Sequence, residues 1–508
     1  MTSPPSSRPS KQREAAGAQR SVSGPPGKRP RMPRAVFAFS RDLRLSDHAG
    51  LAAVARHGDV VAVHVVDSAS ATRLRRSPRR AAYYCAAVAA LDAALRERGS
   101  RLIVRRGNPA HVLRALARAV GAGVVGWSCG YDAKSLRRDR DLQSALEEAG
   151  LRALPVHDAP AIPPEDSAAG HRGGDGYRAF VPYHAQWRTL VPPADAGTAV
   201  FAPVEIASEP LPFPEEFGSQ VAAGEPVGET AERTKLMAFL AGPALQYGVA
   251  RNVPAAGETS RLASALSFGT IAAREVVRAT CYRSTDPFLL VEERTSLKLY
   301  LRSLAQRDFF LQLAWYNESL AEEPLQSKMR GFGFARTHGQ LDAWRSGRTG
   351  YPLIDAGIRE LRATGWMHPR VRAIAASFLC FDLGVDWRVG RDEWDHYLVE
   401  DDPALAAGNW QWIAGVGADL AAYPRIYNPL KQARRFDPAA AYVRRWVPEL
   451  AALPDAAILD PVLGRRQRQM QLPLFGGLSY PEPVVDHETV ARAFLERYAR
   501  EVRAAAPS

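Results

Sequence analysis

The chain has 508 residues, of which 46% are hydrophobic and 24% are charged, and its formal net charge is +12. This length exceeds what one ordinary core needs, so two domains are expected, and the composition is that of a soluble globular protein. The sequence has no uninterrupted apolar stretch of about 20 residues that would span a membrane, and its basic N-terminus lacks the apolar region of a secretory signal. The four cysteines lie far apart, which argues against a disulfide framework or a metal cluster and favours a cytoplasmic enzyme.

The excess of basic residues favours a polyanionic partner, with nucleic acid as the first candidate, although an arginine-rich composition is by itself a weak signal. Part of this charge lies in residues 1–34, which are rich in Ser, Pro, Gly, Lys and Arg. Because this segment has almost nothing to bury, it is predicted to be a disordered basic tail.

From Ala35 onward, short apolar runs alternate with longer amphipathic stretches. The stretch from Arg80 to Arg98 is a predicted helix that ends at Gly99, since glycine commonly terminates helices. Such alternation predicts βαβ units and a Rossmann-like parallel sheet, so residues 35–160 are expected to form an α/β domain. A sheet of this kind binds ligands at the carboxyl ends of its strands. The four predicted strands are Ala35–Phe39, Val60–Val66, Leu102–Val104 and Val124–Cys129.

The second half of the chain has a different pattern. Residues 161–228 carry many Pro, Gly and Ala residues and little periodicity, so they are predicted to connect two domains. Helical periodicity dominates residues 229–508, which predicts an all-α C-terminal domain. Near the end of this region, Ala439–Leu450 and Glu488–Ala505 are two further predicted helices.

Six sequence blocks point to one family. They are RDLRLSD at Arg41–Asp47, GRTGYPLIDA at Gly347–Ala356, TGWMHPRVR at Thr364–Arg372, DWR at Asp386–Arg388, GNWQW at Gly408–Trp412 and PRIYNP at Pro424–Pro429. In their order and spacing, these blocks resemble the cryptochrome/photolyase family over roughly residues 35–450. The resemblance implies that the α/β domain is an antenna domain, that the helical domain binds FAD, and that DNA is the partner.

The positions that match the family's cofactor site are spread over the helical domain. Those at the phosphate end are Tyr247, Arg251, Thr259, Ser260, Arg261 and Leu262, and those around the flavin ring are Arg307, Arg372, Glu400, Asp401, Asp402 and Ala406. Hydroxyls, backbone N–H groups at a helix start and guanidinium groups suit a pyrophosphate, and cations near the ring would stabilise a reduced, anionic flavin. Arg372 and Asp402 could instead form a structural ion pair. Ala406 stands where the family commonly places Asn or Asp, and it cannot hydrogen-bond the flavin's reactive nitrogen.

The family's electron-transfer chain is only partly retained. Trp410 and Trp387 match two of its members, whereas Phe334 stands at the position of the outermost tryptophan. Phenylalanine is far harder to oxidise, so the usual route to the surface is predicted to be cut. Rerouting through Trp344, Trp366 or Trp394 is left open.

The lesion-binding positions also depart from the family. Ser303 replaces the glutamate that hydrogen-bonds a cyclobutane dimer, and Gln306 replaces a tryptophan that stacks on the flipped bases. Arg370 and Trp412 match a lesion contact and the other stacking tryptophan. Ala373 carries neither the methionine of dimer-repair enzymes nor the histidine of (6-4) repair enzymes.

Two functions follow from the resemblance. The first is an FAD-dependent, light-driven repair of pyrimidine dimers in UV-damaged DNA, the deoxyribodipyrimidine photo-lyase reaction, by a monomer. The alternative is a cryptochrome-like blue-light photoreceptor without repair activity, and a flavoprotein that binds DNA without repair is a third reading. Asp132 falls where folate-binding relatives carry a glutamate, which hints at a second antenna chromophore of folate or deazaflavin type.

Overall fold

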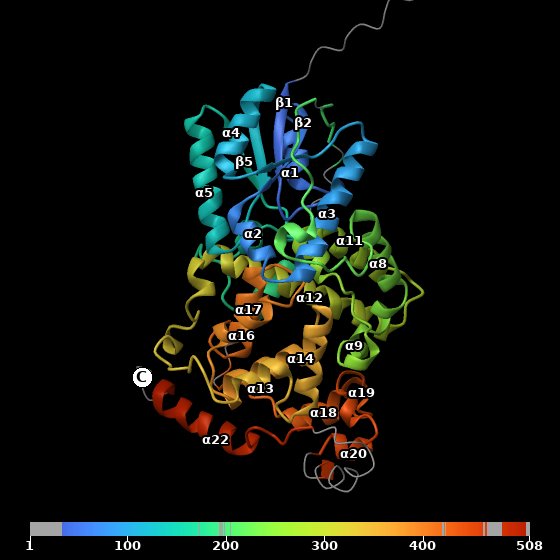
Figure 1. Ribbon diagram of the computed structural model, residues 1–508, viewed down its shortest axis with the longest axis vertical. Helices are drawn as coiled ribbons and strands as arrows, with labels where there is room; N and C mark the ends of the chain where they lie inside the picture. Colours follow the sequence, from blue (N-terminus) through green and yellow to red (C-terminus); the bar gives the residue numbers. More distant parts are fainter. Residues whose placement is uncertain are drawn as a thin grey trace, which may run out of the picture.

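The structure is a computed structural model, in which an α/β domain lies above a helical domain in the view of Figure 1. The residues that it describes are 33–171, 173–190, 192, 197, 199–203, 205–418, 421, 423–460, 463–464 and 480–503. The expected basic tail, residues 1–34, therefore lies outside the described residues except for its last two. Within the described ranges, no helix is both long enough and apolar enough to cross a membrane.

The α/β domain is built on one five-stranded parallel sheet with the order β3-β2-β1-β4-β5. Its strands are β1 (Arg34–Phe39), β2 (Asp59–Val66), β3 (Ile103–Arg106), β4 (Ala122–Ser128) and β5 (Arg152–Val156). The first four overlap the predicted apolar runs, because a parallel strand that is covered on both faces is largely hydrophobic, although β3 continues beyond the predicted run into Arg105 and Arg106. The fifth was not predicted, since this edge strand is only partly buried and contains an arginine and a proline.

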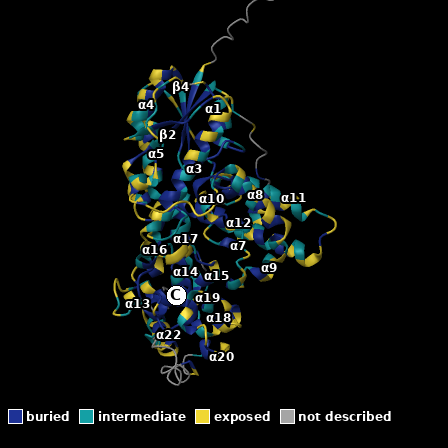
Figure 2. Ribbon diagram, turned by 45° about the vertical axis from the view of Figure 1, so that its right-hand side comes forward, coloured by how far each residue is buried: buried dark blue, intermediate teal, exposed yellow. Residues whose placement is uncertain are grey.

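Helices cover both faces of the sheet, whose strands are the dark blue centre of this domain in Figure 2. One face packs against α1 (Ala49–Ala55) and α3 (Pro78–Glu97), and the other packs against α4 (Pro109–Val120) and α5 (Ala133–Glu148). The short helix α2 (Ser68–Leu74) follows β2. Helix α3 ends next to Gly99, which has a φ of +73°, as predicted.

The segment predicted as a connector, residues 161–228, packs on both domains. It contains α6 (Pro164–Ala168) and α7 (Phe180–Trp187), which contact the long helix α12 (Val291–Tyr316) of the helical domain. It then returns to the sheet, where the Ala202 N–H donates to the Val60 carbonyl, and it ends beyond the 3₁₀ turn η1 (Pro214–Phe217), whose Phe217 is buried in the α/β core. The segment is therefore part of the packed structure of both domains.

From residue 229 onward the named elements of the described ranges are helices, which confirms the predicted helical half. The 26-residue α12 (Val291–Tyr316) runs through its centre and contacts α7, α9, α11 and α17. The other α-helices are α8 (Glu229–Ala241), α9 (Tyr247–Ala250), α10 (Ala263–Phe268), α11 (Ala273–Ser284), α13 (Leu341–Ser346), α14 (Pro352–Thr364), α15 (Pro369–Ser377), α16 (Trp387–Asp395), α17 (Pro403–Ile413), α18 (Pro429–Phe436), α19 (Ala441–Trp446), α20 (Asp455–Ile458) and α22 (His487–Tyr498). Helix α19 lies within the predicted segment Ala439–Leu450, and α22 overlaps the predicted segment Glu488–Ala505 but begins one residue earlier.

The loop after β1, which carries the RDLRLSD block, joins the two domains. Buried Arg44 forms an ion pair with buried Asp158 at 2.7 Å, and Arg274 of α11 donates to Asp158 at 2.8 Å and to Asp47 at 2.7 Å. Burial raises the pKa of Asp158, but Arg44, His48 and Arg274 outweigh burial and hold this pKa well below its usual range. These buried charges are fully paired, so the block fixes the orientation of the domains.

Candidate functional site

The predicted phosphate end lies next to the predicted lesion position. Tyr247 and Arg251 are one turn apart around α9, and the Arg251 guanidinium carbon lies 5.6 Å from the centroid of the Tyr247 ring. The Tyr247 hydroxyl lies 3.1 Å from the hydroxyl of Ser303 on α12, and Ser303 also donates to the Leu299 carbonyl. The cofactor and lesion positions therefore share one wall.

The segment Thr259–Leu262 ends where α10 begins at Ala263, as the sequence predicts. Leu262 is buried and anchors the segment, while Arg261 has a φ of +53°, a left-handed conformation that costs about 1–2 kcal/mol for a residue with a Cβ. This conformation places the Arg261 guanidinium carbon 3.4 Å from the centroid of the Trp366 ring. Backbone strain of this kind clusters at functional sites, which agrees with the predicted cofactor role of this segment.

His368 occupies the centre of a group of cations at the start of α15. It is the N-cap of this helix and is fully buried; its Nδ1 accepts from the Arg370 N–H, and its Nε2 has no hydrogen-bond partner among the described residues. Burial, followed by the charges of Arg370, Arg261 and Arg372, lowers the pKa of His368 to about 3. The imidazole is therefore neutral at physiological pH.

Acidic partners offset only part of the positive charge of Arg370 and Arg372, the two arginines of α15. Arg372 donates to Glu400 at 2.5 Å, so its ion pair is with Glu400 and not with Asp402, the pairing that the sequence left open. Arg370 donates to the Asn252 amide at 2.6 Å and lies 4.8 Å from the centroid of the Phe436 ring. Burial, followed by the Arg251 charge, lowers the pKa of Arg370. The other Glu400 oxygen and the Arg370 Nε are buried and lack partners within the described ranges.

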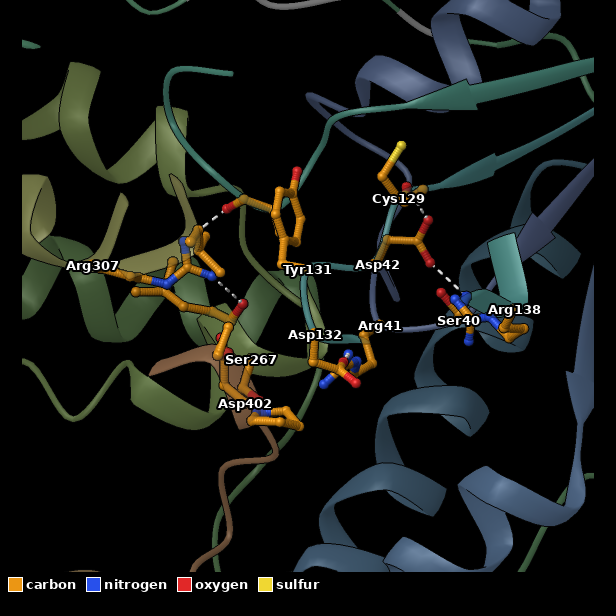
Figure 3. A pocket seen from close by; sticks show the side chains of 17 residues that line it. Ser40, Arg41, Asp42, Cys129, Tyr131, Asp132, Arg138, Ser267, Arg307 and Asp402 are labelled. Atoms are coloured by element: carbon orange, nitrogen blue, oxygen red, sulfur yellow. Dashed lines mark hydrogen bonds and ion pairs between the residues drawn. The ribbon is translucent and has the colours of Figure 1, made fainter. Parts of the chain in front are cut away.

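Arg307 and Asp402, both predicted beside the flavin ring, line a pocket between the domains (Figure 3). The pocket lies at the carboxyl ends of β1 and β4, where the strand order reverses, which is the usual ligand position of such sheets. The Arg307 guanidinium donates to the Ala159 and Leu266 carbonyls at 2.8 and 3.1 Å. Burial raises the pKa of Asp402, which caps α17 by accepting from the Leu405 N–H.

Asp132, the antenna candidate, lies in the same pocket. It caps α5 through the Ser135 N–H and hydroxyl and lies 3.7 Å from the guanidinium of Arg41. Burial raises the pKa of Asp132, but Arg41 and Ser135 outweigh burial and lower it. Buried Asp401 bonds to Arg73 of α2, so this predicted cofactor residue joins the two domains.

Helix α17 places Asp402, Ala406 and Trp410 on one face, because they are four residues apart. Trp412, near the end of this helix, is partly exposed, and its ring centroid lies 6.2 Å from that of Phe310 on α12. Gln306 is three residues after Ser303 on α12 and is also partly exposed. Helices α12 and α17 contact each other. They thus carry the remaining predicted lesion positions, Gln306 and Trp412, and the remaining ring position, Ala406.

Of the predicted electron-transfer residues, Trp410 and Trp387 are buried and Phe334 is partly buried. The ring of Trp410 contacts Trp394 on α16 at a centroid distance of 4.6 Å, and Trp387 lies in the same hydrophobic cluster. Phe334 packs against Phe332 at 4.9 Å and against Phe494 of α22 at 6.1 Å. The outer end of the family's chain is therefore a cluster of phenylalanines.

Sequence reasoning missed several residues of this site. Asn252, which holds Arg370, directly follows the predicted Arg251, and His368 precedes a proline at the start of a helix, which is a recognisable capping position. Arg73 carries no local signal, because its partner Asp401 is 328 residues away.

Two family models match the chain: DNA photolyase over residues 35–202, and the FAD binding domain of DNA photolyase over residues 300–500. A deoxyribodipyrimidine photo-lyase of Streptomyces griseus is 38% identical, over 91% of this chain and 98% of that protein. One of Halobacterium salinarum is 36% identical, over 89% of this chain and 96% of that protein.

Solved structures of two photolyases and a cryptochrome are also similar to this chain. A class III photolyase from Agrobacterium tumefaciens has a TM-score of 0.83 at 31% identity and covers 95% of this chain and 100% of its own. A Synechocystis cryptochrome has a TM-score of 0.81 at 26% identity, with 91% and 99% covered. A Sulfolobus tokodaii photolyase with two FAD molecules has a TM-score of 0.75 at 27% identity, with 92% and 100% covered. Because identities above 30% extend over nine-tenths of its length, this chain belongs to the DNA photolyase family, and its helical half contains that family's FAD-binding domain.

Proposed function

We propose that the protein repairs pyrimidine dimers in DNA by light-driven electron donation from reduced FAD, the reaction of a deoxyribodipyrimidine photo-lyase. The relatives at 36% and 38% identity carry that name. The net charge of +12 suits a partner whose affinity comes largely from phosphate contacts.

One structural observation carries this proposal. Ser303 touches Tyr247, Arg251 stacks on Tyr247, and the next residue, Asn252, holds Arg370. Positions expected to bind FAD phosphates and positions expected to bind a lesion therefore form one continuous wall. Electron donation over a short distance requires such an arrangement.

The residues present fit FAD. Arg251, Arg261, Arg370 and Arg372 bring more positive charge than Glu400 and Glu360 offset, and this surplus suits a pyrophosphate. The buried His368 Nε2, Arg370 Nε and Glu400 Oε2, which lack partners within the described ranges, are available to polar edges of the cofactor. When bound, FAD supplies the electron under light. Of the other predicted cofactor positions, Arg307 and Asp402 would face the flavin ring.

The chain's own residues would hold the lesion. Trp412 would stack on the flipped bases, and Arg370 would neutralise a DNA phosphate. The Ser303 hydroxyl, at the position where relatives use a glutamate, would donate a hydrogen bond to the lesion only by giving up its bond to the Leu299 carbonyl. A neutral His368 would add no charge beside them. Gln306 offers hydrogen bonds but no stacking face.

A blue-light photoreceptor is the second candidate. Ser303 and Gln306 weaken the lesion site while the cofactor wall is kept, and the fold is as close to a cryptochrome as to photolyases. For this function, light would change the binding of a partner while dimers persist.

The test is repair of a thymine-dimer oligonucleotide under near-UV light by protein whose FAD has been chemically reduced beforehand. Reduction beforehand bypasses any internal electron path, so the assay reports on the lesion site alone. Multiple turnovers that are absent in the dark are expected. No repair by protein that contains reduced FAD would contradict the proposal and leave the photoreceptor or a DNA binder without repair activity.

We propose that a second chromophore binds to the α/β domain beside Asp132 and Arg41, and that Arg307 and Asp402, which line the same pocket, face the flavin ring; the Sulfolobus tokodaii relative contains a second FAD. Residues 35–160 would then be the antenna domain and residues 229–508 the FAD-binding domain, with 161–228 packed on both. We also propose a monomer in the cytoplasm, a compartment that suits four free cysteines.

A further inference from the structure

We propose that Asn252 is a positioning residue for DNA binding: its neutral amide holds Arg370 in place without cancelling the charge that Arg370 offers to a DNA phosphate. The inference rests on the proposed function, in which DNA is the partner. It assigns a role to a residue that is not among the predicted cofactor and lesion positions.

The two arginines of α15 have partners of different charge. Arg372 donates to the Glu400 carboxylate at 2.5 Å, which offsets its charge. Arg370 donates instead to the Asn252 amide oxygen at 2.6 Å, and within the described ranges no carboxylate lies at ion-pair distance from it. An amide accepts the hydrogen bond but carries no charge. The full positive charge of Arg370 therefore remains.

The surroundings of Arg370 add to this positive charge. Its guanidinium carbon lies 4.8 Å from the centroid of the Phe436 ring, and that of Arg435 lies 5.2 Å from the same centroid. Burial, followed by the charge of Arg251, lowers the pKa of Arg370, and Arg435 acts in the same direction. A half-buried cation among other cations is costly unless an anion binds to it, and a phosphate is such an anion.

The backbone of Asn252 is fixed by the turn that ends α9. Its N–H donates to the Val249 carbonyl at 2.9 Å, and α9 is itself attached to α12 through the bond from the Gly248 N–H to the Ser296 hydroxyl at 3.2 Å. The amide oxygen of Asn252 thus meets Arg370 at a defined place. The other end of the amide is an NH₂ group, which only donates and so attracts an anion, whereas an aspartate would present a second carboxylate oxygen there.

The experiment uses the FAD-containing protein in the dark and two duplex oligonucleotides of one sequence, one undamaged and one with a single thymine dimer. Dissociation constants are measured over a series of KCl concentrations, because the dependence of affinity on salt reports the number of phosphate contacts. The variants are Asn252→Asp, Asn252→Ala, Arg370→Gln and the double variant Asn252→Asp with Arg370→Gln. Asn108→Asp is the matched control: it adds the same charge at the N-cap of α4, where Asp caps a helix as well as Asn does.

Asn252→Asp keeps the shape of the side chain but converts its contact with Arg370 into an ion pair without net charge. The slope of log Kd against log salt should therefore fall by about 0.7–0.9, the value for one phosphate contact, and both oligonucleotides should bind roughly tenfold more weakly. Arg370→Gln should have the same effect, and the double variant little more, because the two changes act on one contact. Asn252→Ala should weaken binding by about threefold with little change of slope, since Arg370 keeps its charge but must be ordered when DNA binds.

A slope in Asn252→Asp equal to those of the unsubstituted protein and of Asn108→Asp would overturn the inference. A full further loss of affinity on combining Asn252→Asp with Arg370→Gln would do the same, because Asn252 would then act independently of Arg370. Thermal midpoint and FAD content identify a variant that fails to fold. If Asn252→Asp is such a variant, Asn252→Ala and Arg370→Gln still decide, because the inference requires that only the second lowers the slope.

Repair of the thymine dimer is measured separately on the same proteins. Absence of repair together with the expected slopes would contradict the proposed function and leave this inference standing. Repair by the unsubstituted protein together with an unchanged slope in Asn252→Asp would overturn only this inference.

Discussion

Ser303 shows how one residue can limit the proposed chemistry. Its hydroxyl already bonds to Tyr247 and to the Leu299 carbonyl, so it has little capacity left for a substrate. A carboxylic side chain at the same position on α12 would reach further and provide a proton.

For the variant Ser303→Glu, we expect a roughly threefold or larger increase in dimers repaired per absorbed photon, because a hydrogen bond to developing negative charge is a strong stabilising interaction. Quantum yields measured with chemically reduced protein provide the test. Ser303→Ala is the control, and it should not exceed the unsubstituted protein. Equal yields for the Glu and Ala variants would show that this position does not contact the lesion.

At the scale of the element, α15 combines a structural cap with a group of charges. His368 caps the helix through its Nδ1 while burial and three arginines hold its ring neutral. In the unfolded chain the same ring has its ordinary pKa of 6.5 and takes up a proton below that pH. Acid therefore favours the unfolded state over the window from about pH 6.5 down to pH 3.

We expect the apo-protein to lose about 2 kcal/mol of unfolding free energy through His368 alone between pH 7 and pH 5. The variant His368→Asn keeps a capping side chain and removes the titrating group, so its stability should vary less over this range by about that amount. Urea denaturation of both proteins at the two pH values gives the comparison. Parallel pH dependence in the two proteins would mean that His368 is not held neutral.

At the scale of the whole molecule, paired charges set the relation of the two domains. Arg44 and Asp158 come from the sheet side, and Arg274 comes from α11 of the helical domain. A second link joins Arg73 of α2 to Asp401, directly beside the proposed flavin position. Loss of either link would alter the interdomain pocket as well as stability.

Replacing Asp158 with Asn leaves Arg44 and Arg274 buried without their shared counter-charge, which should destabilise the protein by roughly 3–5 kcal/mol. Because the pKa of Asp158 is depressed in the folded state, this stabilisation is present at neutral pH and is lost only as acid protonates the carboxylate. The shift of the urea midpoint at pH 7 measures the effect. Asp166→Asn, at an exposed site on α6, is the control, and a similar small shift in both variants would contradict the prediction.

The sequence by itself determined the elements and the family. Four strands were predictable because strands covered on both faces are largely apolar, and the end of α3 was predictable because Gly99, two residues beyond it, adopts a left-handed conformation. The motif blocks indicated the family, and the resemblance to it predicts the cofactor and lesion positions and places Phe334 in the electron-transfer chain; these assignments stay predictions. Such features depend on residues that are close together in the chain.

Only the tertiary structure decided which distant groups meet. The choice of Glu400 over Asp402 as the partner of Arg372, the link from Arg73 to Asp401, and the contact of Trp410 with Trp394 all depend on how whole helices pack. No local periodicity encodes these pairings, because helix packing brings together side chains whose separation in the sequence carries no information about their separation in space.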